Sequence, residues 1–232
     1  DPTIPADAAL PMRDLASTLA AKRQTLPLDV PFAEEATVGG TIAANINGPR
    51  RLAYGSWRDI VLGIQFVTAE GKLAKGGGKV VKNVAGYDIP KLLIGSFGTL
   101  GVIVEIAFKV FPIPPASATI ALQFRTAENA CRAATHILHS PLLPQSLDLA
   151  DAASGTLAGN VTLRSAPFTL LAGVAGPEEV LARFERELPT LVRVDGLEEF
   201  TCLRGEQEST VWSAIQEMTP AFLRTHSDGI VV

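Results

Sequence analysis

The sequence predicts an α+β protein of two domains, and three observations lead to this prediction. A dense run of prolines at Phe111–Pro115 separates two stretches of different composition, and such prolines do not lie inside a helix or a central strand. Before this run the chain is rich in glycine and ends in a long β-branched segment, Thr99–Val110. After it, strand-like and helix-like segments follow in the order βαβββαβ, with one strand uncertain. This order predicts an antiparallel sheet with helices on one face.

The first domain is expected to contain short elements separated by glycines. Apolar residues at helical spacing, good helix formers and glycine stops identify the helices, and β-branched runs that end in turns identify the strands. The predicted helices are Asp14–Gln24, Gly39–Asn45 and Asp88–Ile94, the last ended by Gly95; the predicted strands are Ile60–Thr68, a segment near Lys72–Lys75 after a turn at Glu70-Gly71, and Thr99–Val110.

The second domain has longer helices. Pro177 opens one of them, at a position where the missing N–H of proline costs nothing. The predicted strands are Ala118–Phe124, Ser146–Leu149, Asn160–Leu163, Thr169–Val174 and Leu191–Val194, and the predicted helices are Thr126–His139 and Pro177–Leu188.

Composition excludes several classes of protein. Of the 232 residues, 47% are hydrophobic and 19% are charged, which predicts a buried core instead of disorder. The formal net charge is −4, and nothing indicates the clustered basic face of a nucleic-acid-binding protein. Cys131 and Cys202 do not form a CxxC pair, and two cysteines agree with a reduced, cytoplasmic chain. The chain contains no run of about 18 apolar residues, so the sequence predicts no membrane-spanning helix.

Glycine motifs in the first domain are the part of the sequence that indicates ligand binding. Gly39 and Gly40 open a predicted helix, where backbone N–H groups and the helix dipole can hold an anion, and Asn45 lies further along the same helix. The segment Gly98–Gly101 precedes a strand whose backbone edge can pair with a flat heterocycle such as adenine. Taken alone, each of these motifs is more often a structural turn.

Two common nucleotide-binding motifs do not fit the sequence. Gly95, Gly98 and Gly101 have the spacing GxxGxxG instead of the dinucleotide GxGxxG. The segment Gly76–Lys79 is followed by Val80, so the Ser or Thr of a P-loop is missing. The first mismatch disfavours an NAD-dependent Rossmann enzyme.

The order and spacing of the glycine motifs resemble the second half of the FAD-binding domain of the vanillyl-alcohol-oxidase, or PCMH-type, family. The strings that carry the resemblance are EEATVGGTIAANINGPRR, YGSWRDIVLG and VVKNVAGYD…IGSFGTLGVI. The resemblance is strong over Glu35–Pro112 and weaker at Asp14–Gln24 and downstream. This family includes FAD-linked D-lactate and D-2-hydroxyglutarate dehydrogenases and glycolate oxidases, and the strings are most similar to the FAD-binding subunits of glycolate oxidases.

The resemblance implies which residues contact FAD. The segment Thr37–Asn45 would face the pyrophosphate and ribose, Gly48 would let the chain pass close to the flavin, and Val102 and Ile103 would contact the adenine side with their backbones. The full set of cofactor-binding residues is Thr37, Val38, Gly39, Gly40, Thr41, Asn45, Gly48, Gly98, Thr99, Gly101, Val102 and Ile103.

Candidate substrate residues are fewer. Arg50 and Arg51 could clamp a carboxylate, although arginines in loops are more often solvated. Tyr87 and Lys82 could approach the cofactor or substrate, and a packed tyrosine and a solvated lysine are equally good interpretations. Arg58-Asp59 is expected to be a structural ion pair.

The sequence identifies no catalytic base and no metal site. His136 and His139 are three residues apart on one predicted helix and share a face, but no further ligand is evident nearby. A partly exposed helix face is the better interpretation of this pair.

The sequence departs from the family at its two ends, and these departures affect the domains that we expect. Nothing in residues 1–34 matches the proline- and glycine-rich loop with which the family wraps the pyrophosphate, and the start at Asp1-Pro2-Thr3 suggests a processed or truncated chain. We therefore expect residues 1–115 to be the second FAD-binding subdomain, with its sheet flanked by helices. Residues 116–232 are expected to form a ferredoxin-like α+β domain that is incomplete at its C-terminus. We expect the chain to bind FAD weakly or not at all.

The resemblance implies a subunit that oxidises a short 2-hydroxy acid such as glycolate with FAD. The cofactor would do the chemistry, and the protein would bind and orient the cofactor and the substrate. Implied partners are a second flavoprotein subunit and an iron–sulfur subunit, through which the protein could associate peripherally with a membrane. Two alternatives remain open: a non-catalytic accessory subunit of the same assembly, or an FAD-linked dehydrogenase of the D-lactate type.

Overall fold

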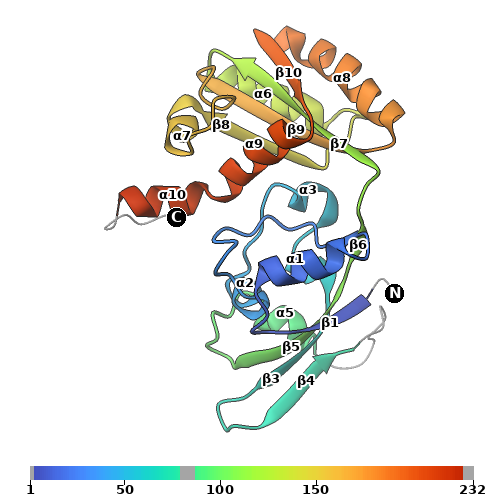
Figure 1. Cartoon of the computed structure of the whole chain (residues 1–232), viewed down its shortest axis with the longest axis vertical. Coiled ribbons are helices and arrows are strands. Elements are labelled where there is room, and N and C mark those ends of the chain that lie inside the picture. The colour runs from blue at the N-terminus through green and yellow to red at the C-terminus, as the bar shows by residue number, and fades with distance from the viewer. Residues whose placement is uncertain (1–2, 79–86, 227–232) are drawn as a thin grey trace. The chain divides into compact units, whose positions relative to one another are not determined.

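A computed structural model describes residues 3–78 and 87–226 of the chain. The chain divides into two compact units, Asp1–Ile113 and Pro114–Val232, and the division lies within the proline-rich run (Figure 1). Both units combine helices with antiparallel sheets, which confirms the predicted α+β class. Each unit is described by itself.

The first unit consists of short helices and a four-stranded sheet of order β1-β5-β3-β4. Its elements are β1 (Thr3–Asp7), α1 (Met12–Ala20), β2 (Gln24–Thr25), α2 (Val38–Ala44), α3 (Arg51–Tyr54), α4 (Trp57–Ile60), β3 (Val61–Val67), β4 (Leu73–Gly77), α5 (Ile89–Leu93), β5 (Val102–Lys109) and β6 (Phe111–Pro112).

Strand β1 was not predicted from the sequence, because Pro5 interrupts a short segment that has little strand character. The strand pairs antiparallel with β5, from Thr3 opposite Lys109 to Asp7 opposite Glu105. It lies at the edge of the sheet. Proline is tolerated at an edge, where one side of the strand needs no ladder hydrogen bond.

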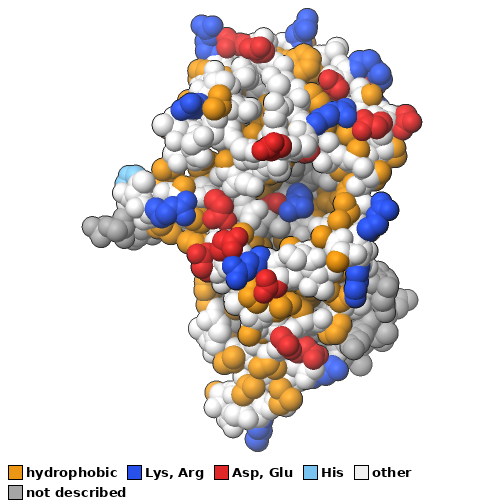
Figure 2. Space-filling model, in the orientation of Figure 1, with side chains coloured by type: hydrophobic (Ala, Val, Ile, Leu, Met, Phe, Trp, Pro, Cys, Tyr) orange, Lys and Arg blue, Asp and Glu red, His pale blue; other side chains and the backbone are white. Residues whose placement is uncertain are grey.

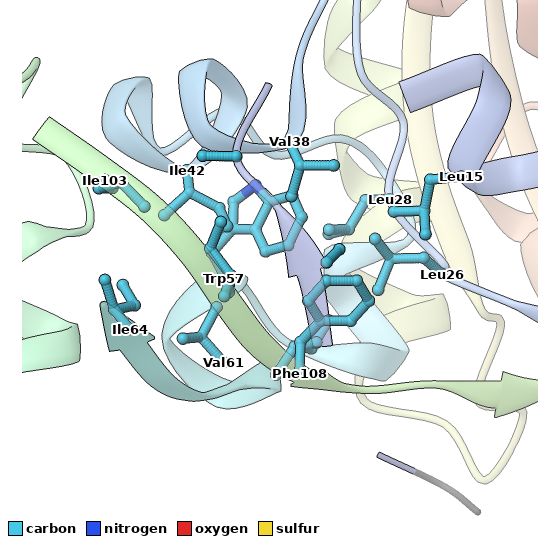
Figure 3. Close-up of a cluster of buried hydrophobic side chains, with 14 of the residues drawn as sticks. Leu15, Leu26, Leu28, Val38, Ile42, Trp57, Val61, Ile64, Ile103 and Phe108 are labelled. Carbon is cyan, nitrogen blue, oxygen red and sulfur yellow. The ribbon is translucent and has the colours of Figure 1, made fainter. Parts of the chain in front are cut away.

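One buried cluster joins the helices of this unit to its sheet (Figure 3). Trp57 of α4 is fully buried at its centre, and its ring meets that of Phe108 of β5 edge-on, with centroids 6.4 Å apart. Val38 and Ile42, which lie one turn apart on α2, are also fully buried in this cluster. Helix α2 is therefore anchored by its apolar face, and its two ends are held in fixed positions above β5.

The second unit has the topology of a ferredoxin-like domain, as the sequence predicts. Its sheet has the order β10-β7-β9-β8, and every neighbouring pair is antiparallel. The elements are β7 (Ala116–Phe124), α6 (Ala127–Leu138), β8 (Ser146–Asp151), α7 (Ala152–Leu157), β9 (Phe168–Gly176), α8 (Glu178–Val192), a 3-10 turn (Arg193–Asp195), β10 (Glu199–Leu203), α9 (Glu206–Gln216) and α10 (Met218–Thr225).

Both faces of this sheet are covered. Ile120, Leu122 and Phe124 of β7 point to one face, where they pack with α6 and α8. The alternate residue Ala121 points to the other face, where it packs with Val211 of α9. The strand therefore carries apolar residues on both sides, which differs from the predicted arrangement with helices on one face only.

Two predicted strands are wrong. Leu191–Val194 belongs to the end of α8 and the 3-10 turn, because Leu181, Leu188 and Val192 continue one buried helical face through Pro189. Asn160–Leu163 is a turn, in which the Asn160 side chain accepts a hydrogen bond from the Leu163 N–H at 3.1 Å. Leu163 is buried because it packs in one cluster with Ala121, Leu171 and Val211, and it is not paired with a neighbouring strand.

Charged side chains of both signs are interspersed on the face of the molecule shown in Figure 2. Among the residues that the structure describes, no helix is long and apolar enough to cross a membrane.

Candidate functional site

The start of α2 is fixed by its own threonines. The Thr37 side chain caps the helix by accepting a hydrogen bond from the Gly40 N–H at 3.2 Å. The Thr41 hydroxyl donates to the Thr37 carbonyl at 2.8 Å. A threonine cap of this kind typically stabilises a helix by about 1 kcal/mol.

The neighbouring N–H groups are also used within the protein. Val38 donates to the carbonyl of Leu10 at 3.0 Å, and Gly39 donates to the carbonyl of Ala8 at 2.8 Å. A Cβ atom at Gly39 would lie 2.6 Å from the Cβ of Ala8, so this glycine permits a close approach between α2 and the segment after β1. The N–H groups expected to hold an anion here are engaged with the protein itself, and Gly39 has a packing role.

The end of α2 leads directly into a polar loop. Asn45 adopts a left-handed conformation with φ of 53°, which ends the helix. The Asn47 side-chain nitrogen donates to the Asn45 carbonyl at 2.7 Å and lies 3.3 Å from the Asn45 side-chain oxygen. The loop therefore turns back on the helix end and places two asparagine side chains together.

The second glycine motif is joined to this helix end, although the two are about fifty residues apart in the sequence. The Gly95 N–H donates to the Ile42 carbonyl at 3.1 Å, and the Phe97 N–H donates to the Ala43 carbonyl at 2.9 Å. Gly95 has φ of 82°, and a Cβ there would lie 3.3 Å from the Cβ of Asn45. The structure thus brings together two of the three strings that carried the sequence resemblance.

The loop that follows is shaped by residues with positive φ. Phe97 has φ of 51° and is 75% exposed, and Gly98 has φ of 76°. A side chain on Gly101 would lie 2.8 Å from both the Phe66 ring and the Val67 carbonyl. These conformations lead the chain into β5, where Val102 is exposed and Ile103 is buried.

Thr99 stabilises this turn. Its N–H donates to the Ser96 carbonyl at 3.0 Å, and its hydroxyl donates to the same carbonyl at 2.7 Å. Among the predicted contacts with FAD, Thr99 therefore has a role that the fold alone explains.

Arg50 is held by a carboxylate of the protein itself. Asp29, which is only 9% exposed, accepts hydrogen bonds from the Arg50 Nε at 2.7 Å and from the Arg50 N–H at 3.1 Å. Gly48 fits against the same aspartate, since a Cβ at this position would overlap the Asp29 Cβ. This differs from the expected clamp for a substrate carboxylate, because the guanidinium of Arg50 already has a carboxylate partner.

The other predicted substrate residues are spread out. Arg51 is exposed in α3, and Tyr87 is 91% exposed at the edge of the described chain. Lys82 lies outside the described residues. No interaction in the structure brings Arg51 and Tyr87 to one point within residues 3–78 and 87–226.

Arg58 and Asp59 do not form the expected ion pair. Asp59 instead closes a capping box at the start of α4, where it accepts hydrogen bonds from the N–H and hydroxyl of Ser56 at 2.8 and 2.9 Å. These hydrogen bonds, the backbone one first, hold the pKa of Asp59 below its usual value. The role of Asp59 is structural, as expected, but its partner is Ser56.

The histidines of the second unit also have structural partners. The His136 Nδ1 lies 2.8 Å from a carboxylate oxygen of Asp195, which is 2% exposed. The His139 Nδ1 lies 2.8 Å from the Thr135 carbonyl in its own helix. The described part of the chain contains no group of three or more His, Cys, Asp or Glu residues that could hold a metal ion.

Two buried polar atoms at the helix end have no partner. The side-chain oxygens of Asn47 and Ser96 are both buried, and neither finds a hydrogen-bond partner among the described residues. Asn47 is bonded to Asn45, and Ser96 follows Gly95, which contacts Asn45. The Trp57 Nε1 and the Thr169 hydroxyl are likewise buried and unpartnered among the described residues, so such atoms are not confined to this helix end.

Comparison with known proteins supports FAD as the cofactor. Residues 1–77 match the family described as "FAD binding domain", which confirms the predicted resemblance to FAD-linked proteins. The match includes residues 1–34, where the motifs gave only a weak resemblance, and it ends before Gly98–Ile103.

Curated relatives are similar to about half of the chain. Glycolate oxidase subunit GlcE of Escherichia coli is 46% identical over 124 residues, which are 52% of this chain and 35% of that protein. Glycolate oxidase subunit GlcD of Bacillus subtilis is 34% identical over 138 residues, 60% of this chain and 29% of that protein. D-lactate dehydrogenase of Archaeoglobus fulgidus is 41% identical over 118 residues, 51% of this chain and 26% of that protein. The chain thus spans about a third of the length of these relatives.

Solved structures support the fold across both units. An alkyldihydroxyacetonephosphate synthase matches with a TM-score of 0.76 and 20% identity, over 97% of this chain and 47% of that chain. A 4-ethylphenol oxidase from Gulosibacter chungangensis matches with a TM-score of 0.71 and 12% identity, over 96% of this chain and 51% of that chain. At these identities the likeness concerns the fold alone.

Proposed function

We propose that this chain is part of an FAD-dependent oxidoreductase that oxidises a short 2-hydroxy acid, with glycolate as the substrate and glyoxylate as the product. Bound FAD would supply the acceptor for the hydride that leaves C2 of the hydroxy acid. The proposal rests on the match of residues 1–77 to an FAD binding domain and on relatives named as glycolate oxidase subunits and D-lactate dehydrogenase.

The main structural support for the proposal is that the glycine motif of α2 and the glycine motif at Gly95–Gly101 lie together at the end of α2. Hydrogen bonds from Gly95 and Phe97 to the carbonyls of Ile42 and Ala43 hold the loop Ser96–Gly101 beside Asn45. This arrangement brings the glycines of the two motifs to one place, and a flat cofactor needs glycines for close approach to the backbone.

The proposed cofactor-binding residues have two different tasks. Those at the start of α2 hold the helix in place through Ala8, Leu10 and the threonine cap. Those at its end and in the second loop offer surface to the cofactor. The proposed set remains Thr37, Val38, Gly39, Gly40, Thr41, Asn45, Gly48, Gly98, Thr99, Gly101, Val102 and Ile103.

We further propose that the chain acts in an assembly. The relatives named GlcE and GlcD are subunits of a glycolate oxidase, which supports partners that include a second flavoprotein subunit and an iron–sulfur subunit. The assembly would lie in the cytoplasm, and any contact with a membrane would be made through the partners.

Flavin titration tests the cofactor assignment. Quenching of flavin fluorescence should reach a plateau as the chain and the flavin are titrated. Flavin concentrations up to the millimolar range allow weak binding to be detected. Substrate oxidation is tested by adding glycolate or D-lactate to the assembled subunits under anaerobic conditions and following loss of the oxidised-flavin absorbance. A wild-type chain that quenches neither FAD nor riboflavin contradicts the cofactor assignment.

An accessory role is the second candidate, and one observation favours it. No histidine is identified as a base among the described residues: His136 and His139 contact Asp195 and Thr135, and His226 stacks on Phe222 with ring centroids 4.4 Å apart. An accessory subunit would bind flavin but leave it oxidised when glycolate is added in the absence of the catalytic partner. Bleaching of the flavin by the chain alone would reject this alternative.

A further inference from the structure

Cationic side chains from three elements gather around Asp59 of α4. The pKa of Asp59 is lowered mainly by its hydrogen bonds with Ser56, and the positive charges of Lys91 and Arg51 lower it further. The Lys109 Nζ donates to the backbone carbonyl of Asp59 at 3.5 Å. Side chains of α3, α5 and β5 therefore lie within electrostatic reach of one another, although they are far apart in the sequence.

Asp88 joins this group through α5. Its carboxylate caps the helix and lies 2.9 Å from the Lys91 Nζ. The hydrogen bond with Lys91 is the main cause of the lowered pKa of Asp88, and the charge of Arg58 contributes to it. Because Lys91 acts on both carboxylates, Arg58 belongs with the cations around Asp59. We define the basic patch as Arg51, Arg58, Lys91 and Lys109.

The carboxylates beside the basic patch do not balance its charge. Asp59 and Asp88 supply two negative charges against the four positive charges of the patch, and both carboxylates are engaged as helix caps. The side chains of Arg51 and Arg58 are exposed, and neither has a hydrogen bond or an ion pair with a residue of 3–78 or 87–226. A local excess of positive charge thus lies on a chain whose formal net charge is −4.

Exposed apolar side chains accompany these guanidiniums. Leu52 follows Arg51 in α3 and is 46% exposed, and Leu92 follows Lys91 in α5 and is 59% exposed. Protein interfaces combine arginine with apolar surface in this way. A densely charged polyanion such as a nucleic acid fits less well, because fixed carboxylates lie among the cations and would repel its phosphates.

We propose that the basic patch binds an acidic segment of a protein partner, whose carboxylates pair with Arg51 and Arg58. Apolar side chains of the same segment contact Leu52 and Leu92. A guanidinium suits this task, because it can bind one carboxylate through two parallel hydrogen bonds. The inference goes beyond the proposed function, since it concerns partner binding by α3–α5 and assigns Arg51 to a partner instead of the substrate.

Two synthetic peptides test this inference. One short, fluorescein-labelled peptide combines Glu with Leu, and the other has Gln in place of every Glu. Fluorescence anisotropy measures their binding to the wild type and to the double variant Arg51→Gln/Arg58→Gln. Arg164→Gln/Arg193→Gln is the matched control, because it removes the same charge from two exposed arginines of the second unit.

We expect the wild type and the control to bind the Glu peptide equally. The double variant Arg51→Gln/Arg58→Gln should bind it about threefold to thirtyfold more weakly, as expected for the loss of two exposed ion pairs. Added salt should weaken binding to the wild type more than to the double variant, because salt screens the exposed charges. The Gln peptide should bind the wild type more weakly than the Glu peptide does. The single variant Arg58→Gln serves if the double variant does not fold.

Several results would overturn the inference. They are equal affinities of the wild type and the double variant for the Glu peptide, equal affinities of the wild type for the two peptides, or the absence of any peptide binding. Displacement of the Glu peptide by inorganic tripolyphosphate at lower concentrations than by unlabelled Glu peptide would identify a phosphate site instead.

Flavin quenching by the same proteins separates this inference from the proposed function. The double variant should quench flavin as the wild type does, and loss of quenching in this variant alone would show that the patch belongs to the flavin site. A wild type that binds the Glu peptide as expected but does not bind flavin contradicts the proposed function and leaves this inference standing.

Discussion

Asp29 and Arg50 form the central ion pair of the loop that follows α2. The two residues are joined by a guanidinium–carboxylate contact of 2.7 Å, and the Arg50 side chain also donates to the Leu28 carbonyl at 3.2 Å. The aspartate is 9% exposed and the arginine side chain 36%. Because Gly48 packs on the same carboxylate, the pair fixes the backbone between Asn47 and Arg50.

Removal of the Asp29 carboxylate should therefore destabilise the first unit. For Asp29→Ala we expect a loss of about 1–3 kcal/mol in the free energy of unfolding, discounted for the partial exposure of Arg50. Urea denaturation measures it. Arg13→Ala is the control, since the Arg13–Glu34 pair has side chains that are 53% and 74% exposed and should contribute about 1 kcal/mol or less. Equal losses in the two variants would show that the Asp29 pair has no special role.

The contact between Gly39 and Ala8 gives a second prediction. Gly39→Ala should destabilise the first unit by about 1–3 kcal/mol, because its new methyl group would overlap the Ala8 side chain. Gly40→Ala, one residue away, meets only the Thr37 hydroxyl at 3.0 Å and should stay within about 1 kcal/mol of wild type. Restoring stability by adding Ala8→Gly to Gly39→Ala would identify the overlap as the cause; failure of this rescue would contradict it.

Two threonines on neighbouring strands should respond in opposite ways to the same change. The Thr119 hydroxyl of β7 accepts from the Trp212 Nε1 at 2.7 Å and donates to Glu208 at 3.0 Å, whereas the Thr169 hydroxyl of β9 has no partner in the described chain. Thr119→Val should cost about 1–3 kcal/mol, and Thr169→Val should be neutral or stabilising. Thermal melting followed by tryptophan fluorescence compares them; a similar loss in both would show that the Trp212 bond is not important.

The capping box at α4 predicts a dependence of stability on pH. The hydrogen bonds from Ser56 lower the folded-state pKa of Asp59 below its ordinary value of 3.8. The stabilisation is therefore present above this value, and it is lost as the pH falls through the folded-state pKa. Asp59→Asn should be less stable than wild type by about 1 kcal/mol at pH 7, and the gap should close below pH 3.8.

Urea denaturation at several pH values measures this gap. Ser56→Ala keeps the backbone N–H that Asp59 accepts from but loses the hydroxyl that caps the Arg58 N–H at 3.2 Å, so part of its gap to wild type should persist at low pH. A gap between wild type and Asp59→Asn that stays constant down to the acid limit of folding would contradict the role of the ionised carboxylate.

Much of the fold could be predicted from local pattern. The order of β7, β9 and the helices α6 and α8 followed from β-branched runs and helical spacing, and Gly95 ends α5 with φ of 82° as expected. The two wrong strands share one cause. Both carry apolar residues whose partners lie elsewhere. Val192 completes the buried face of α8, and Leu163 packs with Ala121 and Leu171 of the sheet. Neither relationship is visible in a short window of sequence.

The candidate site could be predicted only in part. Glycine spacing indicated Gly39, Gly95 and Gly101, because a close approach or a positive φ excludes other residues there. The role of Arg50 could not be predicted, since its partner Asp29 lies 21 residues away in a segment without regular structure. Asn47 was missed because an unsatisfied carbonyl is a property of three-dimensional surroundings and not of residue type.

The pairing of β1 with β5 has a consequence for how the chain folds. The contact of Ala8 with Gly39 places α2 against the segment that follows β1, and β1 is paired from Thr3 opposite Lys109. During synthesis, residues 3–44 therefore cannot reach their final arrangement until the ribosome has delivered the strand ending at Lys109. Such long-range closure slows folding, so the first unit should mature late, with its apolar helix face available to chaperones while β5 is still being made.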